Sequence, residues 1–376
     1  MPQILAPTRR RLLAWSTFGL AALACPRTGC AVQTDADGLR TIFVARRGSN
    51  TLSAIDITTD TPTTPLDLGL EPHALQISQR GGRLAAIDQR SSAVAVADIA
   101  TRSSRTIALP LLPSRLRISP DGKRLALFDD ARGTILLLDG DGREASLIRA
   151  APGIREAIFS GDSATLFVVG GAQAGVTAYD AADGRPSQPI AAPRLDALLR
   201  APNGREGFAL SADAPRTIFH FDLQRRSVIT SVPSPDAAEL FATGTGVQLL
   251  ALGRSGEGFY ILPAEPLRLG VTLSAAAGSS IAYSAWSDTV AFVPDEKSRR
   301  LLIFDLERGK AAGSIALGGV PGAGVVTPNG DKLYLPLEDT GAVAIIDTHL
   351  RQRTASIAIG QAPTQAIIAG GYGLCH

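Results

Sequence analysis

This chain has almost no excess of charge of either sign. Its 37 Lys and Arg stand against 35 Asp and Glu, which leaves a net charge of only +2, and aromatic residues make up just 5% of its 376 residues. Nucleic-acid binding requires a basic patch and often aromatic stacking platforms, and an anionic membrane surface attracts basic clusters. The composition therefore predicts neither a nucleic-acid partner nor a membrane-surface partner.

Signatures of catalysis are also missing. The chain has four His and three Cys, and it contains no nucleophile elbow, Walker loop or dinucleotide fingerprint. The glycine-rich run 253–258 lies in an expected strand hairpin, without the following helix that a phosphate-binding loop requires. Because these catalytic motifs are missing, we lean away from an enzyme. No segment has convincing helical periodicity, so we predict an all-β fold.

The apolar run Leu12–Ala24 is too short to anchor the chain across a bilayer. Arg9, Arg10 and Arg11 precede this run, and it ends in a small-x-small cleavage pattern at residues 22–24. These features predict an export signal over residues 1–24 and a periplasmic or exported protein. Residues 8–13 favour twin-arginine export over the general secretory route.

The first two cysteines leave two alternatives open. Cys25 directly follows the predicted cleavage site, so it is a candidate lipid-anchor cysteine and the only predicted link to a membrane. If it is not lipidated, it could form a small disulfide with Cys30. Residues 25–39 are interpreted as a flexible leader, and residues 40–376 as a single domain.

What the chain does contain is a repeat. Its clearest copy, Ile118–Leu138, reads strand, turn, strand, hairpin, strand and is followed by Asp139; a second copy occupies Thr327–Thr348. An aspartate ends the third strand of seven copies: Asp56, Asp98, Asp139, Asp180, Asp222, Asp305 and Asp347. Their spacings are 41 or 42 residues, except for 83 between the fifth and sixth, where a copy near Pro263 has lost its aspartate.

A period of about 40 residues with four short strands is typical of a β-propeller blade. Seven intact copies and one degenerate copy predict eight blades, with seven as the alternative. The first copy lacks an inner strand, whereas the last copy is followed by an orphan inner-strand segment, Ala362–Gly370. We therefore predict that the strand near 365–369 pairs with the strand near 41–45 and closes the ring, since unpaired sheet edges favour aggregation.

The segments SPDGKRLALF and GAVAIIDT resemble the YVTN family of bacterial β-propeller repeats. The family is related in architecture to the propellers of cytochrome d1 and of the methylamine dehydrogenase heavy chain. The resemblance covers nearly all of residues 40–370, apart from a diverged blade at 233–273. It implies the fold but no activity, because the shared residues belong to turns and packing.

Three residues form a candidate metal site. His73 follows the proline that begins an inner strand, which predicts a position at the mouth of the central channel. Cys375 and His376 end the chain after the closing strand, and a glycine-rich tail would let them fold back toward His73. Thiolate and imidazole ligands suit copper or zinc. The alternative is a chain end without a ligand.

Four arginines form a candidate ligand site. Arg115, Arg117, Arg155 and Arg194 stand at the starts of inner strands, among the acids Glu156, Asp196 and Glu239. Guanidinium groups there could bind an anion through forked contacts. Alternatively, they form ion pairs with these acids in a solvated channel.

Three functions remain. The first is an exported, non-catalytic propeller that binds a protein partner or a small ligand on one face. The second is a cofactor-bearing or accessory redox protein, with a metal or cofactor at the channel mouth; twin-arginine export favours it, because that route carries folded proteins. The third and weakest is a propeller lactonase or hydrolase, since no clustered acid and amide metal ligands are evident in the sequence.

Overall fold

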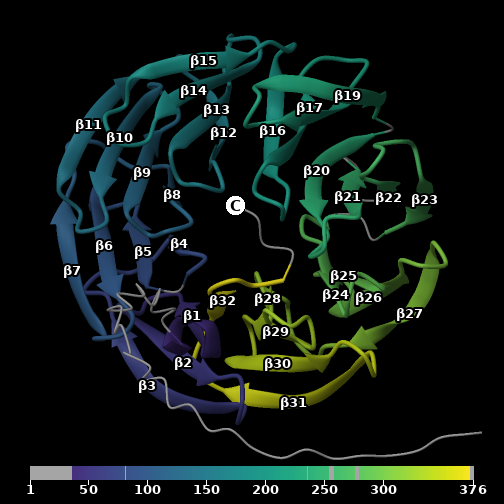
Figure 1. Cartoon of the computed structure of the whole chain (residues 1–376). Coiled ribbons are helices and arrows are strands. Elements are labelled where there is room, and N and C mark those ends of the chain that lie inside the picture. Colours follow the sequence, from purple (N-terminus) through teal and green to yellow (C-terminus); the bar gives the residue numbers. More distant parts are fainter. Residues whose placement is uncertain (1–35, 81, 235, 254–257, 276–278, 373–376) are drawn as a thin grey trace, which may run out of the picture. The chain divides into compact units, whose positions relative to one another are not determined.

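The computed structural model of the protein describes residues 36–80, 82–234, 236–253, 258–275 and 279–372. These residues form eight four-stranded antiparallel sheets, which are the blades of an eight-bladed β-propeller. Figure 1 shows the sheets in a ring, with one strand of each blade nearest the centre. The predicted all-β fold and the number of eight blades are confirmed.

Blades are numbered here in chain order, and each is given from its inner to its outer strand. Blade 1 contains β32 (Pro363–Ile367), β1 (Thr41–Arg46), β2 (Thr51–Asp56) and β3 (Thr61–Asp67). Blade 2 contains β4 (Ala74–Ile77), β5 (Arg83–Asp88), β6 (Ala93–Asp98) and β7 (Ser103–Ala108). Blade 3 contains β8 (Arg115–Ile118), β9 (Arg124–Asp129), β10 (Thr134–Asp139) and β11 (Glu144–Arg149). Blade 4 contains β12 (Ile154–Phe159), β13 (Thr165–Gly170), β14 (Val176–Asp180) and β15 (Pro186–Ile190).

The second half of the ring continues in the same pattern. Blade 5 contains β16 (Leu195–Arg200), β17 (Glu206–Ser211), β18 (Thr217–Asp222) and β19 (Ser227–Pro233). Blade 6 contains β20 (Ala237–Ala242), β21 (Gln248–Gly253), β22 (Gly258–Pro263) and β23 (Val271–Ser274). Blade 7 contains β24 (Tyr283–Ala285), β25 (Val290–Asp295), β26 (Arg300–Asp305) and β27 (Lys310–Ala316). Blade 8 contains β28 (Val325–Val326), β29 (Lys332–Leu337), β30 (Ala342–Asp347) and β31 (Gln352–Ala358).

The two ends of the propeller meet in blade 1, as predicted. β32 pairs antiparallel with β1, with Phe43 opposite Ile367 and Val44 opposite Ala366. The ring is therefore closed by backbone hydrogen bonds between segments more than 300 residues apart in the sequence, and β1 has a partner strand on its inner side.

The aspartate that marks each repeat has a local structural role. Asp56, Asp98 and Asp347 each end a third strand, and each side chain accepts a hydrogen bond from a backbone N–H two or three residues later, at 2.6 Å, 3.0 Å and 2.7 Å. Such side-chain contacts stabilise a tight turn. The repeated aspartate therefore closes the hairpin to the outer strand rather than serving a binding site.

The core lies between the blades. Along each middle strand, alternate residues pack on opposite neighbours: Val44 packs with Tyr334 of blade 8, and Phe43 packs with Leu84 of blade 2. Because both faces of a blade are buried, these strands read as continuous apolar runs rather than as alternating patterns. The outer strands, such as β3 and β7, are mostly exposed.

One boundary differs from the sequence-based expectation. A single helical turn, α1 (Ala36–Arg40), begins within the segment interpreted as a flexible leader, and the Gly38 carbonyl accepts a hydrogen bond from Ala369 N at 3.3 Å. The ordered domain therefore begins a few residues before residue 40. A five-residue turn is too short to produce a periodic pattern in the sequence. Within the described part of the chain, no helix has the length and apolar character needed to cross a bilayer.

Candidate functional site

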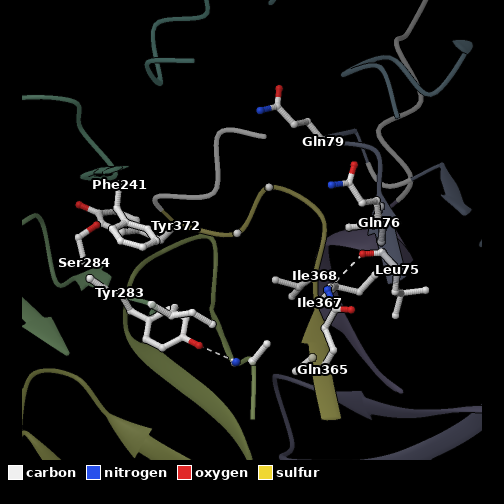
Figure 2. Close-up of a pocket in the computed structure, with 18 of the residues that line it drawn as sticks. Leu75, Gln76, Gln79, Phe241, Tyr283, Ser284, Gln365, Ile367, Ile368 and Tyr372 are labelled. Carbon is white, nitrogen blue, oxygen red and sulfur yellow. Dashed lines mark hydrogen bonds between the residues drawn. The ribbon is translucent and has the colours of Figure 1, made fainter. Parts of the chain in front are cut away.

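A cavity of about 340 Å³ lies among the inner strands. Figure 2 shows its lining, with the Gln76 and Gln79 amides on one side and the rings of Phe241 and Tyr372 on the other. The remaining lining residues are Leu75, Ile77, Leu199, Ile281, Ala282, Tyr283, Ser284, Ala323, Gly324, Gln365, Ala366, Ile367, Ile368, Gly370 and Gly371. Its volume lies within the range of small-molecule sites.

Strand register explains why these side chains meet. Each of five lining residues pairs with the third residue of the neighbouring strand in its own blade, so all five lie at one level of the ring. These pairs are Gln76 with Ala85, Leu199 with Phe208, Phe241 with Leu250, Tyr283 with Phe292, and Ile367 with Phe43. The repeat therefore brings residues from five blades to the same depth of the channel.

The cavity is polar at a few points and uncharged. Gln76 Oε1 accepts a hydrogen bond from Ile118 N at 3.3 Å, and Gln365 Nε2 donates to Leu75 O at 3.2 Å. The Tyr283 hydroxyl accepts from Gly324 N at 2.6 Å, and burial raises the pKa of this phenol, so it is neutral at physiological pH. Amides and hydroxyls thus give orientation to a mainly apolar site.

The described end of the C-terminal segment forms one wall of this cavity. After β32 the chain turns at Gly370, and Tyr372 N donates a hydrogen bond to Val326 O of blade 8 at 3.2 Å. The Tyr372 ring packs with residues of blades 7 and 8, including Tyr283. The segment thus crosses from blade 1 to its neighbours and narrows one end of the cavity.

Two of the four predicted ligand-binding arginines lie together. Arg115 contacts Asp130 at 3.0 Å and Glu156 at 3.3 Å, and Arg117 also pairs with Glu156. Burial raises the pKa of Glu156, but the guanidinium groups of Arg117 and Arg115 outweigh it and hold the pKa below its ordinary value. Both guanidinium groups therefore already have carboxylate partners within the protein.

The side chains of the other two arginines are not brought into this cluster, although the Arg155 carbonyl accepts a hydrogen bond from Arg115. The Arg155 side chain is exposed, and Arg194 forms an exposed pair with Asp213. Among the described residues, Glu239 has no hydrogen-bond or ion-pair partner. Burial, and next the nearby Glu156 carboxylate, raise the pKa of Glu239. None of the four arginines lines the cavity described above.

We expect Glu156→Gln to destabilise the fold by about 1–2 kcal/mol at pH 7. Removing one partner of a buried ion pair costs about 3–5 kcal/mol, and the Glu156 side chain is 25% exposed, which reduces that value. Because the folded state lowers this pKa, the contribution is complete above the ordinary value of 4.5 and declines as the pH falls below it. Urea unfolding from pH 7 to pH 3 should therefore show the wild-type and variant curves converging at acid pH. As a control, Glu144→Gln, at an exposed position, should change the free energy of unfolding little at any pH.

The predicted metal site is only partly described. His73 precedes β4, and its Nδ1 lies 3.2 Å from Asp88 Oδ1. Tyr372 follows β32, at the opposite end of the inner strands, and Cys375 and His376 lie outside the described residues. Within the described ranges, no group of three or more His, Cys, Asp or Glu side chains is arranged to hold a metal ion. A copper or zinc site at the chain terminus thus stays a prediction.

The residues of the cavity were not singled out from the sequence. The signal available was the size of the inner-strand residues. Phe241 and Tyr283 are large aromatic residues at a level where other blades carry Leu199 or Gln76. Inner strands crowd together, so a bulky side chain there either fills the channel or lines an opening in it. Only the assembled ring distinguishes these outcomes.

Comparisons with known proteins identify the fold. No family model and no curated protein matches this chain, so the likeness to the YVTN repeats stays a prediction. Among solved structures, the dihydro-haem d1 dehydrogenase NirN in complex with DHE is similar, with a TM-score of 0.75 and 15% identity over 89% of this chain and 76% of that one.

Two further structures are similar over much of this chain. Apo AztD from Citrobacter koseri has a TM-score of 0.67 and 14% identity, covering 89% of this chain and 98% of that one. Hydrazine synthase from Kuenenia stuttgartiensis has a TM-score of 0.56 and 14% identity, covering 74% of this chain and 95% of that one. At these identities the likeness extends to the β-propeller fold alone.

Proposed function

We propose that this protein is an exported, non-catalytic β-propeller that binds a small, uncharged and largely apolar molecule in its central channel. The cavity of about 340 Å³ carries this proposal. Apolar side chains supply most of its wall, while Gln76, Gln365 and Tyr283 supply a few fixed polar groups. This combination is typical of sites that bind small molecules by burial and orient them by hydrogen bonds.

The polarity of the lining determines the class of ligand. The described residues around the cavity include no Asp, Glu, Lys, Arg or His. A charged ligand would lose its hydration there without gaining an oppositely charged partner, which is unfavourable. The same described lining supplies no pair of groups suited to general acid–base chemistry, and this favours binding over catalysis.

A fluorescent apolar probe tests this function. We expect N-phenyl-1-naphthylamine to bind the wild-type protein with one site per chain. Ile77→Trp should fill part of the cavity and weaken this binding at least tenfold, because the indole occupies space that the probe requires. The matched control is Ile229→Trp on the outer strand β19, where residue 229 is 50% exposed, and it should bind as the wild type does. A wild-type protein that shows no saturable binding would contradict the proposal.

A cofactor-bearing function is the second candidate, favoured by the fold shared with NirN, whose structure contains DHE. The described lining does not fit a tetrapyrrole well: it has no imidazole, thiolate or thioether to hold iron, and no guanidinium to pair with the carboxylates of such a group. Titration with haemin followed by visible absorption separates the candidates. A Soret shift that saturates at one haem per chain would favour the cofactor.

Export is a proposal from the sequence alone. The predicted export signal, residues 1–24, lies outside the described ranges. Intact-mass measurement of the protein recovered from its native compartment tests it. A mature chain that retains Met1 would contradict export, and a diacylglycerol adduct on Cys25 would show a lipid anchor. A protein partner on one face of the propeller stays a further prediction, for which co-purification from the same source is the measurement.

A further inference from the structure

The Tyr372 ring occupies a slot built from two glycines of different blades. A Cβ atom added to Gly244 would lie 2.2 Å from the ring atom Cε1, and one added to Gly330 would lie 3.3 Å from Cδ2 on the opposite ring edge. The turns after β20 and β28 thus face the two edges of one aromatic ring. We call the space enclosed by Gly244, Gly330 and Asp288 the ring slot.

Gly244 leaves room for the ring, and its backbone conformation does not require glycine. Gly330 has φ +80°, a conformation that favours glycine, whereas Gly244 is outside the left-handed region. Equivalent turn positions carry proline in blades 3, 5 and 8 (Pro120, Pro202 and Pro328) and glycine in blade 4 (Gly161), where an added Cβ would meet the backbone of Gly204. At Gly244, by contrast, the nearest atoms that an added Cβ would meet belong to the Tyr372 ring, so blade 6 lacks a side chain where this ring needs space.

Asp288 forms the polar end of the ring slot. Its carboxylate accepts hydrogen bonds from Gly244 N and Thr245 N, both at 2.9 Å, and from the Thr245 hydroxyl. It is carried by three consecutive residues in the left-handed region, Trp286, Ser287 and Asp288, with φ values of 46°, 51° and 61°. Non-glycine residues adopt this region at a cost, and such runs cluster at functional sites. The turn holds a buried carboxylate against the end of the ring.

The Tyr372 hydroxyl lies at the polar end of this slot. It is buried beside the Asp288 carboxylate, which acts on it through its charge and as a hydrogen-bond acceptor. Burial and, next, the Asp288 carboxylate raise the pKa of this phenol. The Asp288 carboxylate is therefore the acceptor that a phenolic hydroxyl seated in this slot faces.

The ring slot is continuous with the channel cavity. Tyr372 and Ser284 line the cavity, and the Ser284 hydroxyl also accepts a hydrogen bond from Gly244 N at 3.1 Å. Figure 2 shows Tyr372 beside Phe241 and Ser284 at one wall of this space. A molecule in the cavity would therefore meet the slot directly if Tyr372 moved away.

We propose that the ring slot is a subsite for a hydroxyaromatic ring of the channel ligand, and that Tyr372 fills this subsite until the ligand replaces it. The inference rests on the proposed function, since it assumes that the cavity binds a ligand. The exchange replaces ring with ring and hydroxyl with hydroxyl, so the apolar contacts at Gly244 and Gly330 are retained. The expected ligands are therefore hydroxyaromatic molecules. Their binding would release Tyr372 from the slot.

Hydrogen exchange of the wild-type chain tests the replacement, with 2-naphthol as probe and 2-methylnaphthalene as its analogue without a donor. Tyr372 N is bonded to Val326 O, so its exchange reports on the seating of the segment. We expect saturating 2-naphthol to speed this exchange at least tenfold and 2-methylnaphthalene to leave it unchanged. Unchanged or slower exchange with bound 2-naphthol would overturn the inference.

Variants test the subsite independently. We expect Tyr372→Ala to bind 2-naphthol at least tenfold more tightly than the wild type, because no side chain competes for the slot. Adding Gly244→Ala to this variant should abolish the gain, since the new methyl occupies the slot. The matched control adds Gly253→Ala instead, where a Cβ would meet nothing closer than 3.4 Å in the same blade. That control should keep the gain.

The outcomes separate the two proposals. If Tyr372→Ala gives no gain, or if Gly244→Ala leaves the gain intact, the ring slot is not a subsite, even where N-phenyl-1-naphthylamine still binds the cavity. If that probe fails to bind the wild-type protein, the proposed function itself fails. Circular dichroism of each variant confirms that a loss of binding is not a loss of fold.

Discussion

A chain that ends at Gly360 is expected to lose the stable fold. This truncation removes β32, so β1 loses its partner strand and the ring opens. It also removes Ile367 and Ile368, which are 7% and 1% exposed. Burying each of these side chains stabilises the fold by about 1.5–3 kcal/mol, before any hydrogen bond is counted. Together they contribute about 3–6 kcal/mol, which reaches the lower end of the total stability of a typical domain, about 5–15 kcal/mol.

Size-exclusion chromatography and urea unfolding measure this outcome. We expect aggregated protein, because an unpaired β1 edge favours association, and we expect no cooperative transition at the wild-type midpoint. The matched control ends at Tyr372 and keeps every described contact of β32. A chain ending at Gly360 that unfolds at the wild-type midpoint would show that blade 1 is stable with three strands.

Asp60→Ala is expected to destabilise the ring by about 2–4 kcal/mol. Asp60 of blade 1 contacts Lys332 Nζ of blade 8 at 2.8 Å and accepts a hydrogen bond from the Tyr334 hydroxyl. Tyr334 is fully buried, and its hydroxyl would lose this partner, at a cost of about 1–3 kcal/mol. Residue 60 also has φ +56°, a left-handed conformation that aspartate tolerates better than alanine, and this adds to the loss.

Two further variants identify the cause of this loss. Asp60→Asn keeps an acceptor and tolerates the left-handed conformation, so we expect a loss near 1 kcal/mol. Tyr334→Phe removes the buried hydroxyl together with its need for a partner, and its loss should also stay near 1 kcal/mol. Equal losses for Asp60→Ala and Asp60→Asn would instead assign the effect to the charge pair with Lys332. Urea unfolding at pH 7 measures all three variants.

The repeat could be predicted because its signals are local. The aspartates Asp56, Asp98 and Asp347 cap turns within a few residues of themselves, and Gly330 adopts the left-handed conformation within its own turn. Such contacts leave the same pattern in every copy, so counting copies predicted eight blades. Ring closure followed from the same count, since one strand was missing at one end and one was left over at the other.

The candidate site could not be predicted in the same way. Charged residues at inner-strand starts were the visible signal, yet Arg115 and Arg117 turned out to pair with acids and lie outside the cavity lining. The cavity instead depends on neutral residues such as Gln76 and Phe241, whose roles follow from their common depth in the ring. No local pattern distinguishes these side chains from ordinary core residues.

By itself, the sequence determined the strands, the turns, the number of blades and the pairing that closes the ring, because backbone hydrogen bonding and turn geometry act over short stretches of chain. Only the tertiary structure decided where the channel stays open and what lines it. Gly244, Asp288 and Tyr372 belong to three separate parts of the chain, and they meet because the blades are rotated around a common axis. The physical reason is that packing across the channel depends on the size and orientation of side chains from several blades at once.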